Sequence, residues 1–372
     1  MKHEKTRILG ALLVIILWAL LAVTAWLKPA DDHSVAERRK LTQAPQFTVE
    51  SFGSGQFAKS FEKYTLDQFP LRDSFRQVKS MFSYYGLLQS DNNNIYVRDG
   101  YVEKLNYPLD EAAVNKAKAT FTQVYEKYIK GKTENIYVAV VPDKGYYLTR
   151  ENGFPAMDYG ALMTQMECDW AQTIDLTSSL TKESYYRTDT HWRQEELLPV
   201  AQKLSQAMGQ TGPTAENYTA ETMDRPFYGV YYGQAALPMK PDEMKLLQSD
   251  VFRDVKVTGY DDLGRPVELP LYYMEAGDDL YDVFFEGSKQ SLVVMENPNA
   301  RTDRHLVIFR DSYGCSIAPL FLEDYAKITL VDLRASQTIP MMVNYRDADV
   351  LFLQSTLVLN NPDSYRIWGE NP

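Results

Sequence analysis

The sequence predicts an α/β protein with a doubly wound parallel sheet, preceded by one membrane-spanning helix. Two observations predict the sheet. Short apolar, β-branched runs have the length of buried strands, and between them lie segments whose apolar residues recur every three or four positions. A third observation predicts the spanning helix, because residues 8–27 form an apolar run that contains no charged residue.

The spanning segment comes first. Lys2, Lys5 and Arg7 precede it, and this positive charge predicts a cytoplasmic tail at residues 1–7 and an extracytoplasmic body. A cleaved signal peptide is the alternative, because Val23-Thr24-Ala25 resembles a cleavage site. The apolar run is long for the core of a signal peptide, which favours an uncleaved signal-anchor at the cell membrane.

Residues 28–94 are predicted to be a linker followed by packing helices. The segment from Pro29 to Gln46 is polar and has no apolar period. Aromatic residues at helical spacing follow between Phe52 and Leu87, and Asp67-Gln68-Phe69-Pro70 interrupts them. Because proline breaks a helix, two short helices are expected here.

Residues 95–372 are predicted to be the α/β domain. Helical periodicity indicates helices near residues 114–128, 159–170 and 197–208. Strand-like runs lie at 136–141, 173–176, 291–295, 306–309, 328–333 and 350–353. Between about 212 and 297, short β-rich pieces such as 251–258 and 269–274 alternate with Gly, Pro and Asp clusters. That stretch is interpreted as an insertion of antiparallel strands that walls a substrate groove.

One strand ends at a serine. The buried run Leu306–Phe309 leads into Asp311 and Ser312, and the apolar segment 317–322 that follows is compatible with a helix. A serine there stands at the carboxyl end of a parallel strand, where open α/β sheets hold their sites. Backbone N–H groups at a helix start also stabilise developing negative charge. The alternative is that Asp311 or Ser312 only caps the helix.

A histidine suited to that serine lies far upstream. The four histidines of the chain are His3, His33, His191 and His305. The first two lie at the membrane end and the last begins the buried strand, which leaves His191 for Ser312. Asp189 precedes His191 by two residues, and an extended chain turns both side chains to one face. In a Ser-His-Asp triad, the carboxylate orients the histidine and the histidine takes the proton of the serine hydroxyl. The alternative is that Asp189 or Thr190 only caps a helix.

These motifs carry a family resemblance. Asp189-Thr190-His191-Trp192, followed downstream by Arg310-Asp311-Ser312-Tyr313-Gly314, resembles the SGNH-hydrolase-like proteins of bacterial polysaccharide O-acetylation. These include the alginate acetylation proteins of the AlgJ and AlgX type and the DHHW family of Gram-positive bacteria. Four further stretches resemble the DHHW family: 37–41, 67–73, 141–144 and 331–334. Thr190 stands where DHHW proteins often have a second histidine, whereas the AlgX-type motif also reads Asp-Thr-His-Trp.

The resemblance covers the chain from about residue 34 onward and implies an SGNH-hydrolase-like, flavodoxin-like fold. It also implies that Ser312, His191 and Asp189 are catalytic and that acetyl is transferred to an exported polysaccharide, with a membrane-bound O-acyltransferase partner delivering the acetyl group. The residues alone leave transferase and esterase open, because the first half-reaction is the same for both. A non-catalytic glycan-binding scaffold of an acetylation complex is the alternative from another class.

Three further residues are candidates for substrate binding. Lys144 and Arg334 each follow a predicted strand, and therefore lie at the same edge of the sheet as Ser312. Tyr313 follows the serine, and the N–H of Ser312 or of Tyr313 is expected to supply part of an oxyanion hole. A solvated loop lysine and a surface arginine are the alternatives for Lys144 and Arg334.

The composition argues against several kinds of partner and cofactor. The net charge of −11 with no basic block argues against a nucleic-acid partner. There is no His/Cys cluster at ligand spacing and no glycine-rich phosphate loop, so neither a metal nor another cofactor is predicted. Cys168 and Cys315 can form a disulfide outside the cytoplasm, although two buried free thiols are the favoured reading.

Overall fold

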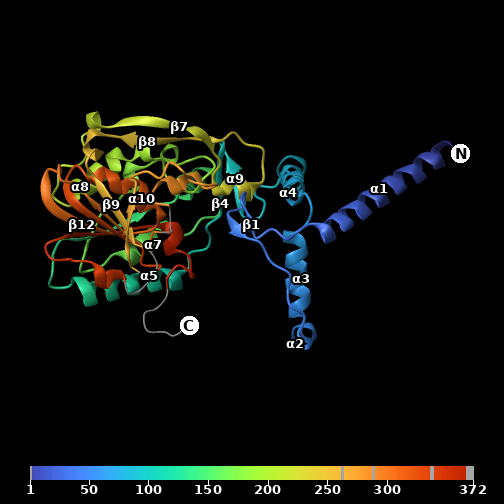
Figure 1. Ribbon diagram of the computed structural model, residues 1–372, viewed down its shortest axis with the longest axis horizontal. Coiled ribbons are helices and arrows are strands. Elements are labelled where there is room, and N and C mark those ends of the chain that lie inside the picture. The colour runs from blue at the N-terminus through green and yellow to red at the C-terminus, as the bar shows by residue number, and fades with distance from the viewer. Residues whose placement is uncertain (1, 261–263, 287–289, 336–338, 366–372) are drawn as a thin grey trace. The chain divides into compact units, whose positions relative to one another are not determined.

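The computed structural model describes residues 2–260, 264–286, 290–335 and 339–365 (Figure 1). The chain forms two compact units. The first comprises Met1–Asn93 and Tyr232–Met239, and the second comprises Asn94–Tyr231 and Lys240–Pro372.

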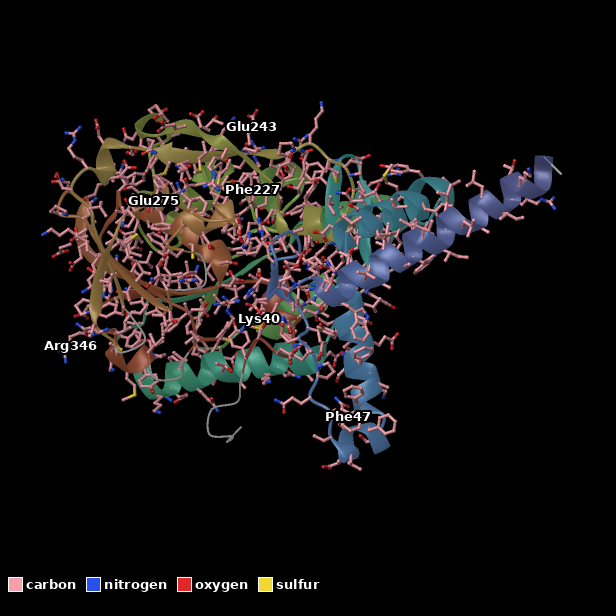
Figure 2. All side chains as sticks on the ribbon, turned by 45° about the vertical axis from the view of Figure 1, so that its right-hand side comes forward. Lys40, Phe47, Phe227, Glu243, Glu275 and Arg346 are labelled. Atoms are coloured by element: carbon pink, nitrogen blue, oxygen red, sulfur yellow. The ribbon has the colours of Figure 1, made fainter. Side chains whose placement is uncertain are left out.

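The first unit begins with α1 (Lys2–Leu27), whose segment Lys5–Leu27 is long and apolar enough to cross a membrane. A short antiparallel pair and three short helices follow: β1 (His33–Ser34), β2 (Arg39–Lys40), α2 (Val49–Gly53), α3 (Gln56–Asp67) and α4 (Arg72–Met81). A π-helical turn, η1 (Phe82–Gly86), continues α4. Phe47 packs on Phe52 and Phe57, beside α2 and the start of α3 (Figure 2).

The second unit is built on an eight-stranded sheet in the order β10-β9-β11-β13-β12-β14-β5-β6. Five neighbouring strands are parallel: β13 (Tyr325–Val331), β12 (Thr302–Arg310), β14 (Asp349–Ser355), β5 (Ile136–Val141) and β6 (Gln172–Thr173). Their carboxyl ends meet at one edge. Two hairpins lie outside this sheet: β3 (Ile95–Arg98) with β4 (Tyr101–Lys104), and β7 (Thr219–Phe227) with β8 (Asp242–Gln248).

One strand, the one expected at residues 291–295, departs from the predicted parallel arrangement. β11 (Leu292–Glu296) runs antiparallel to β13, and β9 (Lys256–Tyr260) and β10 (Pro266–Leu269) continue the sheet as antiparallel strands. The connection from β11 to β12, residues 297–301, is too short for the crossover that a parallel arrangement needs. Part of the predicted insertion therefore extends the main sheet, while β7 and β8 form a separate hairpin.

Helices cover both faces of the parallel strands, as Figure 1 shows. Along β12, Leu306 and Ile308 belong to one apolar core, which they share with α8 (Leu198–Ala207). Val307 and Phe309 point to the other face and join a second core with α5 (Glu111–Val124) and α7 (Tyr159–Met166). Burial on both sides explains why these strands are continuously apolar rather than alternating.

Several element ends differ from the sequence prediction. The helix after the serine, α10 (Ser312–Ile317), starts at Ser312 itself and continues as a 3₁₀ turn, η9 (Ala318–Phe321). Lys144 lies at the start of α6 (Lys144–Asn152) rather than in a loop. The strands expected at 251–258 and 269–274 lie instead at β9 and β10. Both cysteines, Cys168 and Cys315, are buried thiols that form no disulfide.

His305 gives the fold a pH dependence. Its Nε2 lies 2.8 Å from Thr329 Oγ1, and burial, with a smaller effect of Lys327, lowers the pKa of His305 to about 4. The unfolded chain therefore binds a proton below about 6.5 that the native state does not bind until about pH 4. Stability should fall as the pH decreases through this window, and His305→Gln should remove that part of the loss. Urea unfolding of both proteins at pH 7 and pH 5 measures it; equal losses in both would contradict the assignment.

Candidate active site

Ser312 is held at the carboxyl edge of the sheet by its neighbour Asp311. The buried Asp311 caps α10, because its Oδ1 accepts a hydrogen bond of 3.0 Å from the Tyr313 N–H. Its Oδ2 accepts one of 2.8 Å from the Ser355 N–H, at the end of β14. The cap and the strand tie are thus supplied by Asp311, and the Ser312 side chain is left for another role.

The segment with His191 folds back on itself and meets α10. Tyr185 and Trp192 form an isolated antiparallel bridge, which brackets the segment. His191 Nε2 lies 2.7 Å from Ser312 Oγ, and His191 Nδ1 lies 2.6 Å from Asp189 Oδ1. A carboxylate only accepts hydrogen bonds, so Nδ1 carries the proton and Nε2 is free to accept from the serine hydroxyl. The three side chains nominated by the sequence therefore lie in one hydrogen-bonded row.

The Asp189 carboxylate is surrounded by donors. It is fully buried and also accepts from its own loop, with the His191 N–H 3.0 Å from Oδ1. The Val230 N–H donates to Oδ2 at 2.8 Å. Gly229 allows this approach, because a Cβ at that position would lie 2.3 Å from Asp189 Cβ. These contacts fix the carboxylate toward the histidine ring.

A tyrosine from the insertion covers the histidine. The Tyr281 ring stacks on His191 with a centroid distance of 3.7 Å and an interplanar angle of 9°. Its hydroxyl donates to Ser316 Oγ at 2.9 Å, and burial raises the pKa of Tyr281 well above its usual value, so the phenol stays neutral. Trp192 Nε1 also donates to Ser316 Oγ, at 2.8 Å. The His191 imidazole is thus fixed by the stacked Tyr281 ring on one face and by hydrogen bonds at both of its nitrogen atoms.

Lys144 lies beneath the Asp189 segment. It is fully buried, and its Nζ donates to the carbonyl oxygens of Asp189 at 2.8 Å and Tyr186 at 2.9 Å. Glu103 Oε2 lies 3.7 Å from Nζ. Burial lowers the pKa of Lys144 and raises that of Glu103 to about 8. A solvated loop lysine is excluded, and the contacts indicate a residue that positions the Asp189 backbone rather than one that reaches substrate.

The other two substrate-binding candidates also use their polar atoms within the protein. Tyr313 is buried and its hydroxyl donates to the Thr190 carbonyl at 2.5 Å, which fastens the histidine segment to α10. Arg334 follows β13 at the same sheet edge and is partly exposed. Its guanidinium holds both oxygens of Asp332, at 2.9 Å and 2.6 Å. Neither contact joins Ser312 or His191, so a substrate role for these residues stays a prediction.

Asp242 of the insertion also holds this segment. Its carboxylate accepts from the N–H and the hydroxyl of Thr188, at 2.8 Å and 2.6 Å, and from the Arg187 N–H at 3.0 Å. A cleft of about 660 Å³ opens beside it. Residues of the β7–β8 hairpin wall this cleft, together with Tyr101, Arg187 and Arg193. No local motif marks Asp242 or Tyr281 in the sequence, because each acts through a long-range contact.

Comparison with solved structures identifies the fold. A DHHW family protein from Eubacterium siraeum is 21% identical with a TM-score of 0.61, over 74% of this chain and 94% of that one. PatB1 of Bacillus cereus, in a structure with a sulfonyl adduct, is 16% identical with a TM-score of 0.58, over 74% and 100%. The chain shares the fold of these two proteins. The expected SGNH-hydrolase-like α/β fold and the likeness to a DHHW protein are thereby confirmed.

A weaker likeness is to the O-acetyltransferase domain of Pseudomonas putida AlgJ, which is 14% identical with a TM-score of 0.46, over 75% of this chain and 96% of that domain. No family model matches the sequence, and no curated protein does either.

Proposed function

We propose that this protein transfers acyl groups through Ser312, as an O-acetyltransferase of an exported or cell-surface polysaccharide. The observation that carries the proposal is the unbroken row of hydrogen bonds from Asp189 through His191 to Ser312 at the carboxyl edge of the sheet. A helix cap does not need a histidine, and the cap of α10 is Asp311. The nucleophilic reading therefore explains a contact that the cap reading does not.

In the first half-reaction, Ser312 Oγ attacks the carbonyl carbon of an acyl donor while His191 Nε2 takes the hydroxyl proton. Asp189 stabilises the imidazolium through the Nδ1–H bond. The Tyr313 N–H is already bound to Asp311, so we assign the oxyanion to the Ser312 N–H. Collapse of the tetrahedral intermediate returns the proton from His191 to the leaving group and leaves an acyl-serine.

In the second half-reaction, His191 Nε2 removes the proton of an acceptor hydroxyl, and the acceptor oxygen attacks the acyl-serine. The bond between the acyl carbon and Ser312 Oγ then breaks, and His191 returns the proton to Ser312 Oγ. A sugar hydroxyl as acceptor gives transfer, and water gives an esterase. We assign a glycan acceptor to the 660 Å³ cleft, because Tyr101 lines it with a ring and it is lined by Arg187 and Arg193, which flank the Thr188–Trp192 segment in the sequence. The resemblance of the two sequence motifs to polysaccharide acetylation proteins also favours transfer.

The proposed anchoring of the protein in the membrane rests on α1. Its length and composition suit a span, and the basic residues that precede it predict that the body faces outward. An outward body anchored at the membrane can receive acetyl groups from a membrane-bound O-acyltransferase, which we propose as partner. The acceptor is then the polysaccharide on the outer side of the membrane.

A fluorophosphonate probe tests the nucleophile directly, because it labels only an activated serine. The detergent-solubilised full-length protein is expected to be labelled, and Ser312→Ala is expected not to be. The PatB1 structure with a sulfonyl adduct suggests a sulfonyl fluoride as a second probe. Absence of labelling in the wild type, with the fold intact by circular dichroism, would favour a non-catalytic glycan-binding scaffold.

The direction of the reaction needs a cellular measurement. Deletion of the gene should lower the O-acetyl content of the cell-surface polysaccharide if the protein is a transferase. A rise after deletion would identify an esterase that uses the same triad. Complementation with the wild type and with Ser312→Ala separates the chemistry from any effect of the protein's presence.

A further inference from the structure

Helix α4 of the first unit, with its continuation η1, turns an apolar face outward. Five large side chains recur at spacings of four and three residues and so form one line along the helix. They are between 49% and 68% exposed: Leu71, Phe75, Val78, Phe82 and Tyr85. These five residues are called the outer stripe below. The stripe contains no charged residue.

The opposite face of α4 is polar and faces protein. Arg72 pairs with Glu37 at 2.6 Å, and Arg76 donates to the Gly233 carbonyl at 2.8 Å, all within the same unit. Ser80 is buried, and its Oγ accepts a 2.9 Å hydrogen bond from the Asn92 amide. A helix on a water-soluble protein packs with its apolar face inward and its polar face outward. Helix α4 is inverted, which indicates that the medium outside it is apolar.

The neighbouring helices carry the same feature. Phe47 and Phe52 contact each other before and within α2, and Phe57 stacks on Phe61 along α3. Phe47, Phe52 and Phe61 are exposed, as is Leu66 at the end of α3. Large apolar side chains exposed on consecutive helices mark a contact with another protein or with a membrane.

Hydrogen bonds within the first unit favour a membrane, rather than another protein, as the contact of this surface. Asp31 lies four residues beyond Leu27, where α1 ends. The Asp31 N–H donates to Gln68 Oε1 at 2.9 Å, and Gln68 Nε2 donates back to the Asp31 carbonyl at 2.9 Å. Gln68 lies three residues before Leu71, the first residue of the outer stripe. The start of the stripe is thus fastened to the end of the helix that suits a membrane span.

We propose that α4 and η1 lie in the surface layer of the lipid bilayer, with the outer stripe among the acyl chains and the polar face on the protein. Amphipathic helices bind membranes in this way, with the apolar face inserted about 5–10 Å below the headgroups. Tyrosine is favoured at the membrane interface, and phenylalanine is typical of the inserted face of such helices. This inference rests on the proposed anchoring by α1 and is independent of the triad.

Spin labelling of the full-length protein in phosphatidylcholine–phosphatidylglycerol vesicles tests the proposal. Cysteine is introduced singly at Val78 of the stripe, at Gln77 as a matched control, and at Val14 within α1. Gln77 is exposed and adjacent, but points to another side of the helix. The native thiols are buried and not joined in a disulfide, so the unmodified chain measures background labelling. Frequent collisions of the spin label with oxygen indicate that the label lies in lipid. Frequent collisions with a water-soluble nickel chelate indicate that it lies in water.

A label at Val78 should collide more with oxygen than with nickel, as the label at Val14 does, whereas the label at Gln77 should show the reverse ratio. Lipid exposure at Val14 with nickel access at Val78 would overturn the proposal. Dipolar broadening at Val78 would also overturn it, because the stripe would then contact a second copy. Water exposure at Val14 would refute the anchor and this inference together. Fluorophosphonate labelling of the same samples reports the triad separately.

Discussion

Ser312→Ala is expected to abolish acyl turnover while leaving the fold intact. The substitution removes the atom that lies 2.7 Å from His191 Nε2 and that would carry the acyl group. Loss of a serine nucleophile in a triad lowers kcat by roughly 10⁶. Stability should change little, since the α10 cap and the tie to β14 are made by Asp311. Release of acetate from a chromogenic ester measures turnover, and thermal melting measures stability.

Asp311→Ala is the matched comparison for this prediction. It leaves two buried N–H groups, those of Tyr313 and Ser355, without their acceptor, and each such loss costs about 1–3 kcal/mol. The variant should therefore melt well below the wild type. If Ser312→Ala instead keeps full turnover and melts lower, Ser312 is a structural residue, and the scaffold function becomes the better account.

Much of the central sheet could be predicted because its signals are local. The run Ile136–Val141 is apolar and β-branched, and it forms β5 with those bounds. The Asp189–His191 pair is predicted from an extended segment, and that geometric reason is wrong. Residues 187–191 bend back, and a turn in which the His191 N–H donates to Asp189 Oδ1 brings the two side chains together. Ser312 follows a buried strand, and the topology of parallel sheets predicts where such a residue lies.

The remainder depends on contacts between distant parts of the chain. Tyr281 reaches His191 from the insertion, and Asp242 reaches Thr188 across the β7–β8 hairpin. Lys144 is buried because the Tyr186–Asp189 backbone closes over it, which no neighbouring residue in the sequence indicates. Periodicity also predicted a helix at α4 without indicating which of its faces turns inward.

Asp189→Asn should lower turnover by roughly 10⁴, as expected when a triad carboxylate becomes an amide and the histidine takes the wrong tautomer. Three N–H donors converge on this side chain: the His191 N–H and ring Nδ1–H at Oδ1, and the Val230 N–H at Oδ2. An amide accepts through one atom only, so either orientation turns an NH₂ group toward a donor. If the NH₂ group faces the ring, Nδ1 becomes the acceptor and Nε2 carries the proton, which prevents it from activating Ser312.

Ester turnover of Asp189→Asn, measured beside Thr190→Ala, checks this expectation. The Tyr313 hydroxyl donates to the backbone carbonyl of Thr190, and that bond survives loss of the Thr190 side chain. Thr190→Ala should therefore retain most of the activity and most of the fluorophosphonate labelling. Equal, small losses in both variants would show that the buried carboxylate only shapes the loop. In that case His191 would act on Ser312 without help from Asp189.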